Sequence, residues 1–391
     1  MYLGATNGEE KLLHMKSEKY TIKNTAGMFD LLKGIAMFGI IVEHTLSLFP
    51  SNFVYQAARE NASDPHIIPI VLLTLYRILE HALIPSLFFI SGYGFRKISF
   101  KKSISKQFKS LMIPYIITAF LSAGLLLCTH YCLYRHFKDS IKETLSQLGG
   151  SILGLPVTTT YGGIKFFFCG PCWFVMALFV GMIIFNALLA FFDNIKLFIA
   201  VLVVTTFGWL ISLIITTPWC FSQGCISVLF IYLGYYAKKH KLFVEGIDVK
   251  KKVVYVILVF IPYVIIRALG YGDSMSESVY PFGMITIALN GLFAVCFIYT
   301  FLLLNRFNGI ISSSIRSVGR YSIYIVCIHT IDMMGFPLYH FAEKFEDTPL
   351  TVIVFSLIRV AVVCGICFLY IKTKDFVLSK AADKKIPDKN L

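Results

Sequence analysis

The sequence predicts an all-α polytopic integral membrane protein, with about ten transmembrane helices around a polar cavity and both termini in the cytoplasm. Composition is the first observation: 57% of the 391 residues are apolar and 15% are charged, whereas charged residues make up about 25% of an ordinary soluble domain. The second is that apolar runs long enough to cross a bilayer recur with no long polar linker between them. The third is the uneven placement of lysine and arginine, which orients such chains.

Ten apolar runs have the length that a bilayer requires, which is about 20 residues for a helix. We expect one membrane domain at 29–372, between a polar cytoplasmic segment at 1–28 and a basic cytoplasmic tail at 373–391. The longest outer connection, 131–172, suits either a surface loop or a re-entrant one. The expected spans are residues 31–49, 74–95, 111–130, 173–192, 197–217, 221–237, 253–270, 282–304, 321–339 and 350–371.

The net charge of +14 would by itself suggest a nucleic-acid partner. Most of the 36 lysines and arginines, however, fall in connections on the side of the N-terminus. This asymmetry is the positive-inside signal of a membrane protein. We therefore expect membrane lipid around the chain and no nucleic-acid partner.

Lys33 and His44 are the most informative pair in the first expected span. Eleven helical steps place their side chains on one face, about 16 Å apart along the axis. Ionisable groups inside a membrane are costly and are therefore candidates for function. The alternative is that Lys33 snorkels to the surface and His44 only bonds a neighbouring helix.

Further ionisable residues from several expected spans fall at a similar depth. A purely structural ion network is one interpretation, because buried charges persist when they are paired. A water-accessible cavity is the other, in which His44 beside Glu43 acts as a general base. Besides His44, the residues of this polar layer are Glu43, Arg77, Glu80, His81, Arg267, His329, Asp332 and Arg359.

Motifs for metals and cofactors are missing from the sequence: it has no zinc-ligand spacing, phosphate-binding glycine loop, nucleophile elbow or dinucleotide fingerprint. We expect no metal and no tightly bound cofactor. Cys169 to Cys172 spell the thioredoxin tetrapeptide, but they abut Trp173 at the start of a span, so coincidence is favoured over a redox site. A disulfide could persist at Cys169 and Cys172, or at Cys220 and Cys225, near the outer face.

Five short motifs occur in an order that resembles the acyltransferase-3 membrane family, which O-acylates sugars and other acceptors. Lysine replaces the family's arginine at position 33 and in the two-basic motif, which keeps the charge but loses bidentate geometry. The motifs are Lys33-x10-His44, the run from Phe88 to Phe95 with Ser91-Gly92, Lys106 and Lys109 before Pro114, Trp173-Phe174-Val175, and the run from Ser317 to Tyr324 followed by His329.

The resemblance implies a donor, acyl-CoA with acetyl-CoA as first choice, that enters from the cytoplasm. Arg96, Lys106 and Lys109 would bind its phosphates, with Lys33 at the mouth of the cavity. His44 would act as general base or acyl relay, oriented by Glu43, and Arg77, Arg267 or another layer residue would stabilise the oxyanion.

The acceptor that the resemblance implies is a cell-surface glycan or a lipid-linked sugar, in a bacterial cytoplasmic membrane. Trp173 would stack on a sugar ring there, although such a residue more often anchors a helix at the interface. Two other functions stay open. A proton-coupled secondary transporter would use the same polar layer, and a non-catalytic subunit of a glycan-assembly complex would use neither donor nor base.

Overall fold

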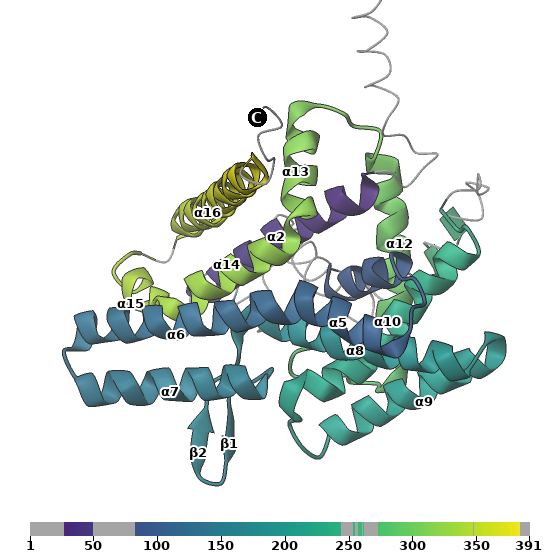
Figure 1. The fold of residues 1–391 in the computed structure, drawn as a ribbon, viewed down its shortest axis with the longest axis horizontal. Helices are drawn as coiled ribbons and strands as arrows, with labels where there is room; N and C mark the ends of the chain where they lie inside the picture. The colour runs from purple at the N-terminus through teal and green to yellow at the C-terminus, as the bar shows by residue number, and fades with distance from the viewer. Residues whose placement is uncertain are drawn as a thin grey trace, which may run out of the picture.

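The structure is a computed structural model that describes residues 27–49, 83–243, 253–254, 257–259, 261, 273–346 and 348–383. The described chain is mostly helical, as the sequence predicts (Figure 1). The one sheet within these residues is a small hairpin, in which β1 (Thr159–Tyr161) pairs with β2 (Ile164–Phe166) in antiparallel register.

The helices follow each other with short connections. An unlabelled helix, Leu83–Tyr93, comes between α2 and α5. The labelled helices are α2 (Met28–Leu46), α5 (Phe100–Gln107), η1 (Phe108–Met112), α6 (Ile113–Tyr134), α7 (Phe137–Leu153), η2 (Gly170–Cys172), α8 (Trp173–Phe191), α9 (Asn194–Ser212), η3 (Pro218–Cys220), α10 (Phe221–Lys239), α12 (Met284–Leu304), α13 (Ile310–Arg320), α14 (Ser322–Gly335), α15 (Leu338–Ala342) and α16 (Pro349–Asp383).

Six helical segments of the described chain are long and apolar enough to span a membrane, and this is an integral membrane protein. They confirm the apolar character of six of the ten expected spans, while the count of ten and the side of the termini stay predictions. Helices Leu83–Tyr93 and Ser322–Gly335 are apolar but shorter. The run 253–270 and the first part of 74–95 lie largely outside the described residues. The six are Phe100–Tyr134, Gly170–Phe191, Asn194–Ser212, Pro218–Lys239, Met284–Leu304 and Leu350–Val377.

The connection 131–172 contains more structure than a loop. Its helix α7 turns back and packs beside α6 (Figure 1). Tyr115 of α6 donates a hydrogen bond from its hydroxyl to the Ser151 carbonyl oxygen at 2.5 Å, and His130 Nδ1 lies 2.9 Å from the Ser140 hydroxyl. The polar residues of α7 are thus used in holding α6, and the sequence gave no periodic apolar signal strong enough to reveal this helix.

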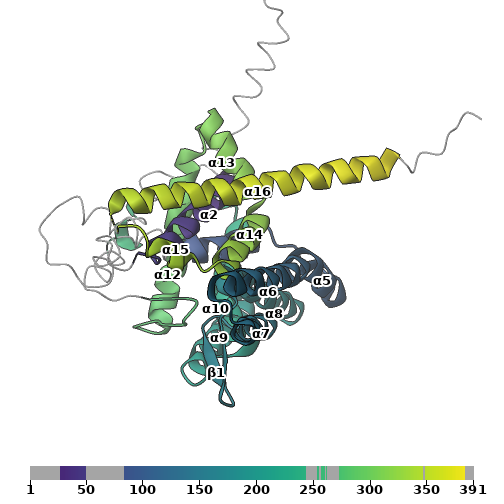
Figure 2. The same cartoon turned by 90° about the vertical axis from the view of Figure 1, so that its left-hand side faces the viewer.

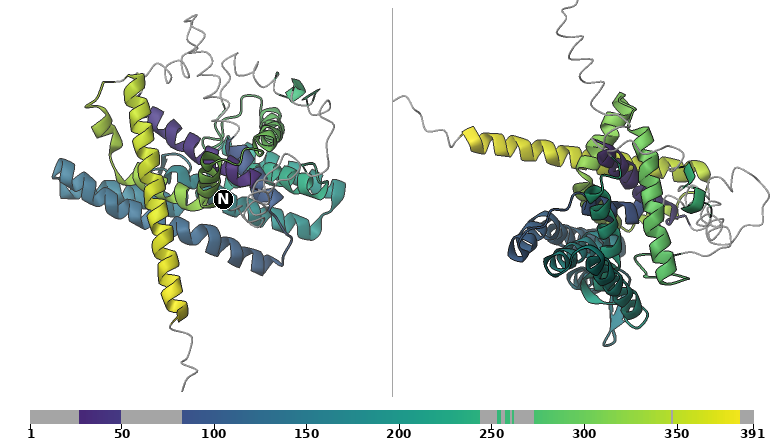
Figure 3. Two further views of the ribbon diagram at one scale, coloured as in Figure 1. Left: turned by 90° about the horizontal axis from the view of Figure 1, so that it is seen from above. Right: turned by 90° about the vertical axis from the view of Figure 1, so that its right-hand side faces the viewer.

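Helix α16 is long and lies across the others, as the turned views show (Figures 2 and 3). Its buried residues recur at positions 352, 356, 359, 363 and 367, a spacing of three to four that makes one face of a helix. This face packs against α2 and α14. It includes Arg359, so the packing of α16 carries a charged group into the interior.

Helices α2 and α13 approach each other closely because glycine lies at both contact points. A Cβ atom added to Gly319 would collide with the carbonyl oxygen of Asp30, and one added to Gly34 would collide with that of Ile315. Main-chain atoms cannot move aside as a flexible side chain can. Nearby, the buried guanidinium of Arg316 donates to the carbonyl oxygens of Gly27, Phe307 and Asn305, which fixes the start of α2.

We predict that Gly319→Ala destabilises the protein by about 1–3 kcal/mol, because the added methyl overpacks the α2–α13 contact. The matched control is Gly124→Ala in α6, where an added Cβ meets nothing within 4 Å. That control should be neutral, or stabilising by up to about 1 kcal/mol. Thermal unfolding of both variants in detergent checks this, and equal unfolding temperatures would contradict it.

Candidate functional site

A cavity of about 110 Å³ lies beside His44. It is bounded by α2, the start of helix Leu83–Tyr93, the start of α8, α10, α14, α12 and the segment 273–280 that leads to α12. Three predicted site residues, Glu43, His44 and Trp173, line it together. The other lining residues are Ile40, Ile84, Pro85, Pro171, Phe174, Phe230, Asp273, Ser274, Met275, Ser276, Tyr280, Asn290 and Val326.

Helical geometry explains how α2 presents its functional residues. Ile40, Glu43 and His44 are at positions i, i+3 and i+4, so they share the face that meets the cavity. The helix ends two residues after His44, and the Ser47 hydroxyl donates to the His44 carbonyl oxygen at 3.0 Å. Both the acid and the imidazole are half-buried, which suits groups at the edge of a small polar cavity.

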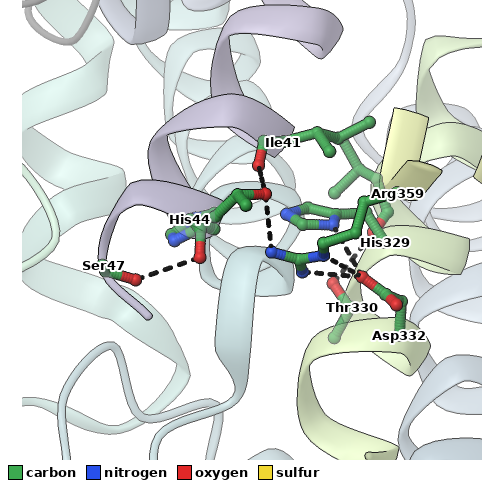
Figure 4. A network of polar contacts seen from close by, with 9 residues as sticks. Ile41, His44, Ser47, His329, Thr330, Asp332 and Arg359 are labelled. Carbon is green, nitrogen blue, oxygen red and sulfur yellow. Dashed lines mark hydrogen bonds and ion pairs between the residues drawn. The ribbon is translucent and has the colours of Figure 1, made fainter. Parts of the chain in front are cut away.

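An ion pair lies behind His44, on the side away from the cavity (Figure 4). Arg359 of α16 donates to Asp332 Oδ2 of α14 from Nη2 at 2.6 Å and from Nε at 3.0 Å. Its Nη1 donates to the Thr45 hydroxyl at 2.9 Å, and that hydroxyl donates to the Ile41 carbonyl oxygen at 2.8 Å. The pair thus joins α16, α14 and α2 at the position of the catalytic candidate.

His329 lies between this ion pair and His44. Its Nδ1 is 3.6 Å from Asp332 Oδ2, and its ring centroid is 5.3 Å from that of His44, with the ring planes 35° apart. The side chain is 1% exposed, and neither ring nitrogen has a hydrogen-bond partner among the residues described. His44 is therefore backed by a second imidazole rather than by lipid or solvent.

Both interpretations of the polar layer hold in part. Arg359 and Asp332 neutralise each other and tie three helices, which is the behaviour of a structural ion network. Glu43 and His44 face a cavity, which is the behaviour of a functional site. The sequence brought these residues to one depth, and the structure separates them into a supporting group and a cavity-facing group.

The basic residues predicted to bind a donor lie at the other end of the bundle. Lys33 pairs with Asp30 at 2.9 Å, about 16 Å along α2 from His44. Arg96, Lys106 and Lys109 are exposed. They lie near the last turns of α8, where Asn186 Nδ2 donates to the Ile98 carbonyl oxygen at 3.1 Å. Trp173, at the first residue of α8, lines the cavity at the opposite end of that helix.

Sequence reasoning missed the polar residues on the segment 273–280 and on α12. Asp273, Tyr280 and Asn290 line the cavity with His44. Asn290 lies inside an expected span, so an amide in an apolar run was the available signal, but only ionisable residues were weighed. Four predicted residues lie outside the described part of the chain, namely Arg77, Glu80, His81 and Arg267.

The ten cysteines are free thiols, and those at the start of α8 pair differently from the tetrapeptide. The Cys172 thiol hydrogen-bonds with that of Cys327, and the Cys220 thiol with that of Cys169. Neither Cys169–Cys172 nor Cys220–Cys225 is bridged. In the residues that the structure describes, no group of three or more His, Cys, Asp or Glu side chains is placed to hold a metal ion.

A comparison with protein families decides the class. The model of the acyltransferase-3 family, described as an acyltransferase domain, matches residues 28–371, which is nearly the whole chain. This chain belongs to the acyltransferase-3 family. The match confirms the resemblance carried by the five motifs, and it makes the chain a membrane acyltransferase. Comparisons with curated proteins and with solved structures found no match.

We predict that Arg359→Leu destabilises this acyltransferase by about 3–5 kcal/mol, because the Asp332 carboxylate stays buried without its partner. Adding Asp332→Leu should recover most of that loss, since two apolar side chains leave no uncompensated charge. A double-mutant cycle on unfolding in detergent measures the coupling between the two residues. Additive losses would show that the pair does not stabilise the helix junction.

Proposed function

We propose that this acyltransferase moves an acyl group, acetyl in the first instance, from cytoplasmic acyl-CoA to a hydroxyl of a cell-surface glycan or its lipid-linked precursor. The location would be the bacterial cytoplasmic membrane. The observation that carries the proposal is the cavity that His44 and Glu43 share with Trp173. An imidazole, a carboxylate and an aromatic ring in one small cavity suit the deprotonation of a hydroxyl on a ring-shaped acceptor.

His44 is the proposed general base. Its imidazole takes the proton of the acceptor hydroxyl as the oxygen attacks the thioester carbonyl carbon, and the C–S bond breaks as the new C–O bond forms. The proton then passes to the departing CoA sulfur, so the imidazole is neutral again at the end. The acyl-relay route differs in one respect: the imidazole first takes the acyl group itself.

The carboxylate of Glu43 would stabilise the imidazolium that forms during the reaction, because it faces the same cavity from the next position of α2. His329, Asp332 and Arg359 would act by positioning. Arg359 already donates to Asp332 and Thr45, so we assign it the support of α2 and not an oxyanion. A rigid support matters because catalytic groups act only when held near the productive geometry.

The donor would reach the cavity from the basic end of the bundle. Arg96, Lys106 and Lys109 are exposed cations in a short stretch of chain, which suits the phosphates of a nucleotide. The flexible arm of acyl-CoA would then extend along the face of α2 from Lys33 to His44, about 16 Å. Placing the phosphates at one end and the acceptor at the other keeps the anionic donor apart from the acidic cavity.

We predict that His44→Ala lowers acyl transfer by about 10²–10⁴-fold, the usual contribution of a positioned general base. Purified protein in nanodiscs with labelled acetyl-CoA and an acceptor provides the measurement. His240→Ala is the matched control, since His240 is exposed at the end of α10, and it should transfer at the wild-type rate. Unchanged transfer by His44→Ala would exclude the imidazole as base.

Lys106→Gln with Lys109→Gln should raise the KM for acyl-CoA, because two cations that bind phosphate are lost. The kcat at saturating donor should stay unchanged, and the effect should shrink as salt rises. The control pair is Lys142→Gln with Lys165→Gln, which removes two exposed lysines on α7 and β2. Equal KM values for both pairs would place donor binding elsewhere.

A further inference from the structure

We infer that Asn290 and Tyr280 form an acceptor-binding wall that hydrogen-bonds uncharged hydroxyl groups. The inference rests on the proposed function, and it assigns the acceptor subsite to residues that no motif marks. Both side chains line the cavity that contains His44. The class of ligand follows from which polar atoms this wall leaves available and from the charges around them.

Asn290 presents a hydrogen-bond acceptor to the cavity. Its Nδ2 donates to Asp273 Oδ2 at 2.5 Å, and the carboxylate can only accept, which fixes the orientation of the amide. Its Oδ1 is then left without a hydrogen-bond partner among the described residues, although the side chain is only 3% exposed. A buried acceptor left unpaired costs about 1–3 kcal/mol, and a hydroxyl donated by a ligand would remove that cost.

Tyr280 adds a second unpaired group. Its residue is 7% exposed, and its hydroxyl has no partner within the described part of the chain. A phenol both donates and accepts. Together the two side chains offer one fixed acceptor and one adaptable donor-acceptor, the pattern that matches two hydroxyls of a sugar or another polyol.

The charge of the cavity selects against anionic acceptors. Its lining includes the carboxylates of Glu43 and Asp273, and the described lining includes no lysine or arginine. A carboxylate or phosphate on the acceptor would meet like charges in a small site with little water, which is unfavourable. We therefore assign the wall to uncharged hydroxyls.

The wall is held in place before any ligand binds. Gln223, at the start of α10, donates from Nε2 to the Ser276 carbonyl oxygen at 3.0 Å and to the Ser278 hydroxyl at 2.9 Å. Main-chain bonds between Ser274 and Val279 close the same segment. Because the segment is tied to α10, the ordering of Tyr280 costs little when an acceptor arrives.

The test uses full-length protein in nanodiscs with labelled acetyl-CoA and a panel of methyl hexosides, each compared with its uronic acid. We expect the wild type to acetylate a neutral hexoside in preference to its acid. Tyr280→Phe and Asn290→Leu should each raise the KM for that hexoside by about three- to tenfold, the worth of one hydrogen bond. Hydrolysis of acetyl-CoA without acceptor should not change, because the donor does not contact this wall.

Tyr299→Phe is the matched control, since this α12 tyrosine donates to the Leu242 carbonyl oxygen at 3.5 Å and does not line the cavity. Tyr280→Phe removes a single oxygen, so it tests the wall even if Asn290→Leu fails to fold. Unchanged KM values, or a preference for the acids, would overturn the inference while leaving the proposed function standing. Failure of the wild type to turn over acetyl-CoA would instead refute the proposed function.

Discussion

The buried ion pair between Arg359 and Asp332 is the interaction on which the rest of the site depends. A guanidinium that is 5% exposed in an apolar helix is stable only when its charge is neutralised and its donors are used. Asp332 does the first, and Thr45 takes a further donor. Because Thr45 is the next residue after His44, the electrostatic requirement of α16 also fixes the imidazole that faces the cavity.

Close packing at the opposite end of α2 complements this arrangement. There the helix is held by glycine contacts with α13 and by the hydrogen bonds of Arg316. Helix α2 is thus fixed at both ends, by main-chain contact at the start and by an ion pair near the end. A rigid α2 keeps the distance between Lys33 and His44 constant, as a donor that extends from one end of the bundle to the other would require.

Physical reasons explain which parts of the site could be predicted from the sequence. His44, His329, Asp332 and Arg359 stood out because an ionisable residue in an apolar run is costly and therefore rare, and the structure brings all four together. Asn290 and Tyr280 did not stand out, since amides and phenols are common in membrane helices and their connections. Their importance appears only when the three-dimensional fold shows which atoms are left without partners.

The fold divides in the same way. Long apolar runs such as Met284–Leu304 and Leu350–Val377 were predictable from composition alone. Helix α7 was not, because its buried face consists of serine, glutamine and glycine, which carry no apolar periodicity. The contact of Gly319 with Asp30 was equally hidden, because a close approach of two helices depends on their relative placement.

The most direct test of the central claim is a structure of the protein with a thioether analogue of acetyl-CoA, which cannot transfer its acyl group. The account predicts that the nucleotide contacts the lysines of α5 and η1 and that the carbon replacing the reactive carbonyl lies in the cavity beside the His44 ring. An analogue bound with that carbon away from His44, or separated from the cavity by packed side chains, would contradict the account.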